Sequence, residues 1–368
     1  MSFGERLAAL SARQKVAAGL ATVVVVVGGT VGGVVAASGS TQHAAAPSSP
    51  PTTVTPTPTP KPKPKPKPKP KPRPKRPRLN PLTGWGGVPK GPVVAVKIDD
   101  TGNGRPQRGV DQADIVYVEQ AEGGLTRLVA VFASHKPVVE AVRSTRTSDP
   151  ELLTQYGPIA FVASGGGGDS LPALDRSILR SVINDRGGVG FGRDGSRPVP
   201  YNLTSNLGAV SSAVRGASGA RSIGFTWSFT LNGARSTLGP QVNTVVGGTP
   251  VSFRWNGRIK RYVRSIGGQL QSAADGRPIA TPNVIVQYCQ VTVHPGDVDV
   301  AGNPAQYTHS VGRGKVVVFR NGRRIDGTWS RPYSKAPTSL RDGRGKSIAL
   351  APGGAWVILV ANGAPLTS

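Results

Sequence analysis

The chain has 368 residues, with 45 Lys or Arg against 19 Asp or Glu, so its formal net charge is +26. A charge of this sign favours anionic partners but says nothing about the fold. The single cysteine, Cys289, excludes an intramolecular disulfide, and no cysteine near the N-terminus is present to carry a lipid.

The first expected element is a membrane-spanning helix over Val16–Ala37, a stretch of 22 residues without a charge. Such a helix is ~33 Å long, and a bilayer core is ~30 Å thick. Arg6, Arg13 and Lys15 precede it, so the positive-inside rule places residues 1–15 in the cytoplasm and the bulk of the chain outside the cell membrane. The sequence therefore predicts a single-pass membrane anchor. A cleaved signal peptide is the alternative, since small residues follow the apolar run.

Within this segment, Gly28 and Gly32 are four residues apart, and so are Gly29 and Gly33. Small residues at this spacing let two helices approach closely. The pattern is compatible with a helix-mediated dimer. The alternative is that it reflects only the abundance of glycine in the span.

Residues 38–78 are expected to form a disordered, Pro-rich linker. Six Lys-Pro dipeptides run from Lys61 to Pro72, and residues 61–78 carry ten basic side chains and no acid. Proline fixes φ and lacks an N–H, and like charges repel, so the segment should be an extended polyproline II stalk reaching at most ~125 Å. It acts either as a spacer alone or as a spacer that also contacts anionic wall polymer or an anionic lipid surface.

Residues 79–245 show a mixed pattern that predicts an α/β or α+β domain. Apolar runs of strand length alternate with two segments that carry helix signals. Past Thr249, short β-rich runs are separated by Asn-Gly, Asp-Gly, Pro-Gly and Gly-Gly turns, which predicts a smaller, mostly-β domain over residues 246–368. The expected strands of the first domain are 92–100, 113–119, 125–133 and 159–163, and its expected helices are 149–157 and 171–183.

Several motifs in this region follow one another in the order found in one protein family. They are Pro81–Gly84, Val94–Asp100, Arg105–Tyr117, Glu122–Arg127 and Val142–Arg146, followed by Gly312–Gly322, Gly327–Trp329 and Pro352–Trp356. With these motifs the chain resembles the DUF3048 family, whose best-known members are YerB-type bacterial lipoproteins. The resemblance covers most of residues 80–362, and it implies a two-domain envelope protein of unknown activity.

The chain departs from the pattern of that family in three places. An anchor helix stands in place of a lipid-modified cysteine. Ala163 and Tyr201 occupy positions at which the family pattern has histidine. If those histidines serve a reaction in other members, this chain lacks it.

A glycine run separates an expected strand from an expected helix. There, the backbone at Gly165 and Gly166, together with Asp169 and Ser170, could hold an anionic or carbohydrate ligand at the start of the helix. The alternative is that Asp169 or Ser170 is a plain helix N-cap. The Gly-Asp-Ser-Leu letters at 168–171 match a hydrolase motif. Neither downstream histidine has an aspartate three residues before it, so no catalytic base is supplied.

The most prominent charged residues lie at or just past the ends of the expected strands. Open α/β sheets bind ligands at such ends, and arginine recognises carboxylate or phosphate through two parallel hydrogen bonds. The carboxylates could instead serve acid/base chemistry on a glycosidic bond, hold a divalent cation, or brace the strand ends through ion pairs. The residues are Asp99, Asp100, Arg105, Glu119, Glu122, Arg127, Arg143 and Arg146.

Other kinds of site receive less support from the sequence. The histidines lack ligand spacing, so we expect no metal site, and we expect no cofactor and no nucleic-acid partner for an exported chain. Cys289 lies in an apolar run and is expected to be an inert, buried thiol. Four tryptophans are candidates either for stacking on sugars or for core packing. They are Trp227, Trp255, Trp329 and Trp356.

Two functional hypotheses follow. In the first, the folded part is a non-catalytic module that binds an anionic or saccharide cell-envelope polymer. In the second, it is a cell-wall glycan hydrolase or transferase that uses Asp99, Asp100, Glu119 and Glu122 as acids. The absence of a Ser/His or Cys/His pair favours the first, while catalysis and substrate identity stay open.

The basic linker generates the first testable prediction. A fragment of residues 38–368 should co-sediment with anionic vesicles or wall polymer, and binding should weaken steeply from low to physiological salt because exposed charges are screened. A fragment of residues 79–368 lacks the ten basic residues of the linker and should bind distinctly less. Equal binding by the two fragments would mean that the linker is only a spacer.

Overall fold

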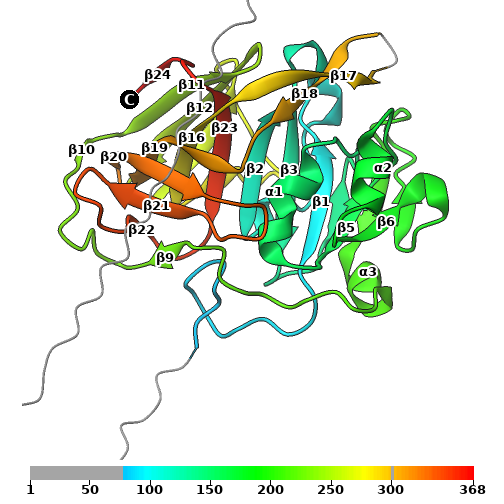
Figure 1. Cartoon of the computed structure of the whole chain (residues 1–368), viewed down its shortest axis with the longest axis horizontal. Helices are drawn as coiled ribbons and strands as arrows, with labels where there is room; N and C mark the ends of the chain where they lie inside the picture. The colour runs from blue at the N-terminus through cyan, green and yellow to red at the C-terminus, as the bar shows by residue number, and fades with distance from the viewer. Residues whose placement is uncertain (1–77, 300–301) are drawn as a thin grey trace, which may run out of the picture. The chain divides into compact units, whose positions relative to one another are not determined.

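The computed structural model describes residues 78–299 and 302–368 (Figure 1). The anchor expected over residues 16–37, its glycine pairs and all but the last residue of the expected linker lie outside this range. In the described part of the chain, no helix has the length and apolar character needed to cross a bilayer.

β-Strands dominate the described residues, and the helices are few and short (Figure 1). The α-helices are α1 Asp149–Leu153, α2 Ser170–Asp175 and α3 Leu207–Ala213, and the 3-10 turns are η1 Gly102–Gly104, η2 Val110–Gln112, η3 Glu122–Gly124, η4 Thr154–Tyr156 and η5 Asn184–Arg186.

The largest sheet has eleven strands, in the order β10, β20, β19, β16, β23, β2, β3, β1, β5 and β6, with β21 paired to β20. Its strands are β1 Val94–Asp99, β2 Ile115–Gln120, β3 Thr126–Phe132, β5 Ala160–Ala163, β6 Arg180–Ile183, β10 Thr237–Leu238, β16 Asn283–Cys289, β19 Gly312–Arg320, β20 Arg323–Arg331, β21 Ser339–Asp342 and β23 Ala355–Ala361.

A six-stranded sheet has the order β14, β13, β12, β11 and β24, with β15 paired to β13. Three small sheets are formed by β4, β8 and β7, by β17 and β18, and by β22 and β9. These strands are β4 Val138–Glu140, β7 Phe191–Arg193, β8 Leu203–Asn206, β9 Thr226–Trp227, β11 Gln241–Val246, β12 Thr249–Asn256, β13 Arg261–Ile266, β14 Gln269–Leu270, β15 Ala280–Thr281, β17 Val291–Val298, β18 Pro304–Thr308, β22 Ala349–Leu350 and β24 Leu366–Thr367.

Strands from the N-terminal domain and from the mostly-β C-terminal domain meet in the large sheet. β2 pairs in parallel with β23, so that Ile115 faces Ala355 and Val118 faces Ile358. β23 pairs in parallel with β16 on its other side. In Figure 1, β23 (red) lies beside β2 (teal) at the centre of the sheet. One hydrogen-bonded sheet therefore contains residues from both domains.

Both faces of the large sheet are covered, which explains why its central strands are buried along their whole length. On one face, Val118 and Ile358 belong to a buried cluster with Phe253 of the six-stranded sheet. On the opposite face, Val357 belongs to a cluster with Leu153 of α1. The core thus has two layers, one on each side of the sheet.

Cys289 and two of the tryptophans lie in this core. Burial raises the pKa of the Cys289 thiol to about 12, so the thiol is protonated and inert at neutral pH, as the sequence predicted. Trp329 and Trp356 are buried, whereas Trp227 and Trp255 are only partly buried. Core packing therefore accounts for Trp329 and Trp356.

The helix expected over residues 171–183 is wrong in its second half. α2 covers only Ser170–Asp175, and residues 180–183 form β6, which pairs in parallel with β5. Val182 and Ile183 are buried in the clusters on opposite faces of the sheet, which is the alternation of a strand. The apolar spacing fitted a helix because a helical turn and a strand follow each other closely. The helix expected from Asp149 is confirmed as α1 followed by η4.

The shared sheet predicts cooperative unfolding. The fragment of residues 79–368 should show one calorimetric transition, because neither domain can keep its part of the core without β2 beside β23. Ile358→Ala, at a fully buried central position, should cost about 2–5 kcal/mol and lower the Tm of that single transition. Two separate transitions, with only one displaced by the substitution, would contradict this prediction.

Candidate functional site

On one face of the large sheet, a row of charged side chains lies at the edge of the apolar core. In the pairing registers of β2, β3 and β1, Arg127 stands opposite both Glu119 and Asp99. Side chains directly opposite each other on neighbouring strands share a face, so acid, base and acid lie side by side. Lys97, two residues before Asp99 in β1, lies on the same face.

Lys97 is the centre of a fully buried ion-pair group. Its ammonium contacts Glu119, and it donates to Asp149 Oδ1 of α1 at 2.7 Å. Asp149 Oδ2 accepts from Thr145 Oγ1 at 2.9 Å and from the Arg146 amide at 2.7 Å. Burial raises the pKa of Glu119, and Lys97 offsets only part of the shift. This group braces α1 against the sheet and is closed to solvent.

Asp99 lies between two arginines. Its Oδ2 is 3.1 Å from Arg143 Nε and 3.6 Å from Arg127 Nη2, yet it accepts no hydrogen bond from any described residue. The Arg143 guanidinium lies over the Tyr201 ring, 5.4 Å from its centre. The Arg143 side chain is 22% exposed, against 7% for Arg127. Arg143 is therefore the member of this trio that solvent reaches.

Arg146 is held more completely. It contacts Glu122 with two nitrogens, and its Nη1 donates to the carbonyls of Ser144 at 3.1 Å and Thr145 at 3.0 Å. Burial alone would raise the pKa of Glu122, but the hydrogen bonds and charge of Arg146 outweigh it and lower the pKa. Burial together with Arg143 and Arg146 lowers the pKa of Arg127, although Asp99 opposes this.

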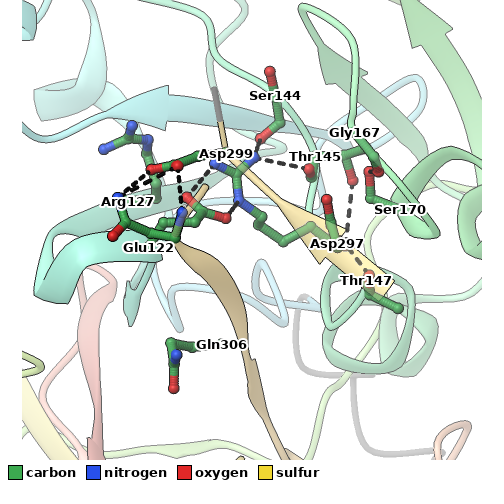
Figure 2. A network of polar contacts seen from close by, with 12 residues as sticks. Glu122, Arg127, Ser144, Thr145, Thr147, Gly167, Ser170, Asp297, Asp299 and Gln306 are labelled. Carbon is green, nitrogen blue, oxygen red and sulfur yellow. Dashed lines mark hydrogen bonds and ion pairs between the residues drawn. The ribbon is translucent and has the colours of Figure 1, made fainter. Parts of the chain in front are cut away.

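The hairpin of β17 and β18 brings C-terminal residues to this site. Asp297 at the end of β17 is buried, and its Oδ2 accepts from Thr147 Oγ1 at 3.3 Å. Figure 2 shows Asp297 and Thr147 close to Gly167 and Ser170. Burial raises the pKa of Asp297 despite the charge of Arg146. Nothing in the sequence around Asp297 indicated this placement.

The glycine run packs against the same hairpin. The amide of Asp169 donates to the Gly296 carbonyl at 3.2 Å, and Asp169 Oδ2 lies 3.2 Å from His294 Nε2. A side chain at Gly168, whose φ is +44°, would collide with the Gly296 carbonyl. Ser170 Oγ donates to the Gly167 carbonyl at 2.6 Å, and the side chain of Asp169 does not cap α2.

Farther along the run, Gly165 and Gly166 face other parts of the N-terminal domain. The Gly165 carbonyl accepts from the Thr145 amide at 2.9 Å, and a Cβ there would meet Asp185. A Cβ at Gly166 would meet Ser170 Oγ. Close packing therefore accounts for the small residues at these two positions.

Asp100 and Arg105 do not join the group. Asp100 makes a two-pronged ion pair with Arg264 of the six-stranded sheet, at 2.9 and 2.6 Å, and accepts from Thr126 at 2.7 Å. Burial opposes ionisation of Asp100, but Arg264 outweighs it and lowers the pKa. Arg105 donates to the Thr101 carbonyl and lies near Gln271. Asp100 directly follows Asp99, and successive side chains along a strand point to opposite faces of the sheet. The side chain of Asp100 therefore points to the face opposite the one that carries Asp99.

The structure thus brings together five of the sequence candidates, which we call the arginine cluster. Glu119 lies beside this cluster and is paired with Lys97. Within residues 78–299 and 302–368, no three His, Cys, Asp or Glu side chains are grouped as a metal ion would require. Lys97, Asp149 and Asp297 were not among the candidates from the sequence, although a lone lysine inside an apolar strand signalled the first. The cluster consists of Asp99, Glu122, Arg127, Arg143 and Arg146.

Two domain models, a relative from Bacillus subtilis and a crystal structure are similar to this chain. Residues 82–220 match the model of the N-terminal domain, and residues 241–357 that of the C-terminal domain, of a family described as "Protein of unknown function (DUF3048)". "Putative lipoprotein YerB" of Bacillus subtilis (strain 168) is 35% identical over 104 residues, which is 28% of this chain and 29% of that protein. The chain is therefore aligned with less than a third of that relative.

A crystal structure of YerB protein from Bacillus subtilis is similar with a TM-score of 0.66 and 21% sequence identity. The similarity covers 79% of this chain and 100% of that one. At this level of identity the likeness concerns the fold alone.

The buried ion-pair group generates a prediction about stability. Lys97→Met keeps the volume of the side chain but leaves Glu119 and Asp149 buried without their cation. Such a loss costs about 3–5 kcal/mol, and each kcal/mol shifts the Tm of a protein this size by about 2–4 °C. We expect the Tm at neutral pH to fall by about 10 °C.

The pH dependence of this loss has a defined sign. Removing Lys97 raises the pKa of Glu119 in the folded state further above its unfolded value. In the parent this pKa is already about 7, so parent and variant both bind the proton below pH 7 and differ in proton binding mainly above it. The stability deficit of the variant should therefore shrink as the pH falls from about 9 to about 7. Thermal melts of the variant and the parent at both pH values test this. If the difference in Tm between parent and variant were the same at both pH values, protonation of Glu119 would not be its cause.

Proposed function

This chain belongs to the DUF3048 family, and we propose that it is an extracytoplasmic, envelope-associated protein whose folded part binds an anionic group of a cell-envelope polymer. Its similarity to a protein named as a lipoprotein supports the location. The proposal includes the anchor over residues 16–37 and the linker over residues 38–78, which would hold the folded part away from the membrane surface.

The observation that carries the proposal is the guanidinium of Arg143, the member of the arginine cluster that solvent reaches. Glu122 is paired with Arg146, whereas Asp99 faces both Arg127 and Arg143. The buried Nε atom of Arg143 faces Asp99, while 22% of the Arg143 side chain is exposed. Phosphate and carboxylate groups accept two parallel hydrogen bonds from arginine, so an anionic ligand would bind to the terminal Nη atoms of Arg143.

Neutral donors adjoin the accessible arginine and would suit a saccharide backbone. Ser144 and Ser164 are partly exposed, and their hydroxyls lie 3.3 Å apart. The amide of Ser164 donates to the Arg143 carbonyl at 2.9 Å, which fixes the start of the glycine run beside the arginine. The Tyr201 ring lies against the Arg143 guanidinium. Hydroxyl groups and an aromatic ring beside a cation fit an anionic glycan better than a bare ion.

The alternative, hydrolysis or transfer of wall glycan, receives less support from the burial of the carboxylates. Asp99 is 0% exposed and Glu119 is 1% exposed, and both are committed to ion pairs. A general acid or base must come within hydrogen-bond reach of the substrate. Glu122 is also buried and paired with Arg146. The carboxylates fit the role of orienting arginines better than that of attacking a sugar.

Arg143→Met tests the proposal in the fragment of residues 79–368, from which the basic linker is absent. Loss of a charged hydrogen-bond partner should weaken binding of a phosphate-bearing wall polymer by about tenfold or more. The Tm should change little, because Arg143 is partly exposed and Arg127 still faces Asp99. Binding is measured by titration calorimetry, with a neutral glycan as the comparison ligand.

The matched control is Arg186→Met, which deletes the same charge from an exposed ion pair with Asp175. It should bind as the parent does. An equal loss in both variants would show that net charge alone attracts the polymer, and unchanged binding by Arg143→Met would remove the arginine cluster from the proposal.

A further inference from the structure

A second region of the molecule has the features of a binding site and shares no residue with the arginine cluster. A pocket of about 660 Å³ lies where the loop after β1 meets β4, the turn between β7 and β8, and a loop of the C-terminal domain. This volume is within the range of small-molecule sites. Among its lining residues are Arg108, Glu140, Asp194, Arg197 and Asp275.

Glu140 is the residue of this pocket whose partners are incomplete. It is 1% exposed, and its Oε1 is buried without a hydrogen bond from any described residue. The nearest cation is Arg197, whose Nε is 3.5 Å from Oε1. Arg197 is also committed elsewhere, since it donates to the carbonyls of Gly104 and Pro106. Burial raises the pKa of Glu140. A buried carboxylate in this state lacks donors that a ligand can supply.

Arg108 is the complementary residue. It forms an antiparallel bridge with Glu140, in which each backbone N–H donates to the other residue's carbonyl, at 3.1 and 3.2 Å. Residues directly opposite each other in such a bridge point to the same side of the sheet. Both residues line the pocket, and Arg108 is exposed. The charge of Arg108 opposes the rise in the pKa of Glu140, so the two side chains are electrostatic neighbours. An exposed cation and an incompletely hydrogen-bonded carboxylate therefore lie side by side in the pocket.

The other two carboxylates of the pocket are occupied. Asp194 Oδ1 accepts from the amide and the hydroxyl of Ser196, at 2.8 and 2.6 Å. Asp275 accepts from Arg277 at 2.7 Å. A ligand of this pocket would therefore carry one group that donates hydrogen bonds to Glu140 and one group that accepts hydrogen bonds from Arg108.

We propose that this pocket binds a small zwitterion, an unblocked amino acid or short peptide, with its ammonium group at Glu140 and its carboxylate at Arg108. The ammonium supplies the donors that Glu140 lacks, and the carboxylate receives the two parallel hydrogen bonds that arginine favours. The pocket draws on both domains, so its occupation also ties the loop at Ala274 and Asp275 to the N-terminal domain.

The test is calorimetric titration of the full-length chain in detergent with three probes. The probes are the dipeptide Ala-Ala, its N-acetylated form and its C-terminal amide. Ala-Ala should bind, and blocking either end should weaken binding by about tenfold or more, because each block removes one charged partner. Glu140→Gln should weaken Ala-Ala to a similar extent and should leave the already weak N-acetylated form unchanged. Arg108→Met should likewise weaken the binding of Ala-Ala and should leave the already weak binding of the C-terminal amide unchanged.

Asp175→Asn, a charge deletion at an exposed ion pair, is the matched control and should bind as the parent does. Failure of all three probes to bind would overturn the proposal. So would equal binding of Ala-Ala by the parent and by Arg108→Met, or loss of Ala-Ala binding in Arg143→Met alone, which would assign the dipeptide to the arginine cluster. If Glu140→Gln does not fold, the comparison of blocked and unblocked probes on the parent protein and Arg108→Met still decides the outcome.

Discussion

The parallel pairing of β2 with β23 is the contact on which the rest of the structure depends. It makes one sheet from strands on both sides of residue 245, and so it requires cover on both faces. The six-stranded sheet covers one face, and α1 with its neighbouring loops covers the other. Because β2, β3 and β1 are central strands of this arrangement, their charged ends lie where the two domains meet. The arginine cluster at these ends is formed by the N-terminal domain, and Asp297 of the C-terminal domain lies next to it.

A second connection fixes how the C-terminal hairpin approaches that site. Glu151 of α1 accepts from the amides of Ser310 and Val311, at 2.7 and 3.0 Å, and its other carboxylate oxygen accepts from Tyr307 of β18 at 3.1 Å. Arg331 of β20 donates to the Glu151 carbonyl. The base of the hairpin is thereby bound to α1, which in turn is bound to the sheet through Lys97. These contacts position Asp297 next to the arginine cluster.

The buried carboxylates fall into two kinds, which differ in how completely their hydrogen bonds are satisfied. Asp100 has a two-pronged arginine and a threonine hydroxyl, so its charge is fully matched inside the protein. Such pairs orient the parts they join, although they give little net stability once the loss of hydration is counted. Asp99 Oδ2 and Glu140 Oε1 instead lack hydrogen bonds among the described residues. Each lies beside an arginine that solvent or a pocket reaches, and both proposals made here depend on that incomplete matching.

The sequence by itself determined the strands at the centre of the N-terminal domain, the helix that starts at Asp149 and the family, because these depend on local apolar runs, turn residues and short motifs. It also indicated that charged residues gather at strand ends. Which of them meet was decided only by the tertiary structure. Asp99 and Asp100 are adjacent in the chain, yet one faces Arg127 and Arg143 while the other pairs with Arg264 in a different sheet. The apolar spacing over residues 171–183 was likewise ambiguous until β5 supplied a partner for β6. An ion pair or a strand pair needs a partner brought from far along the chain by packing, and no local pattern contains that partner.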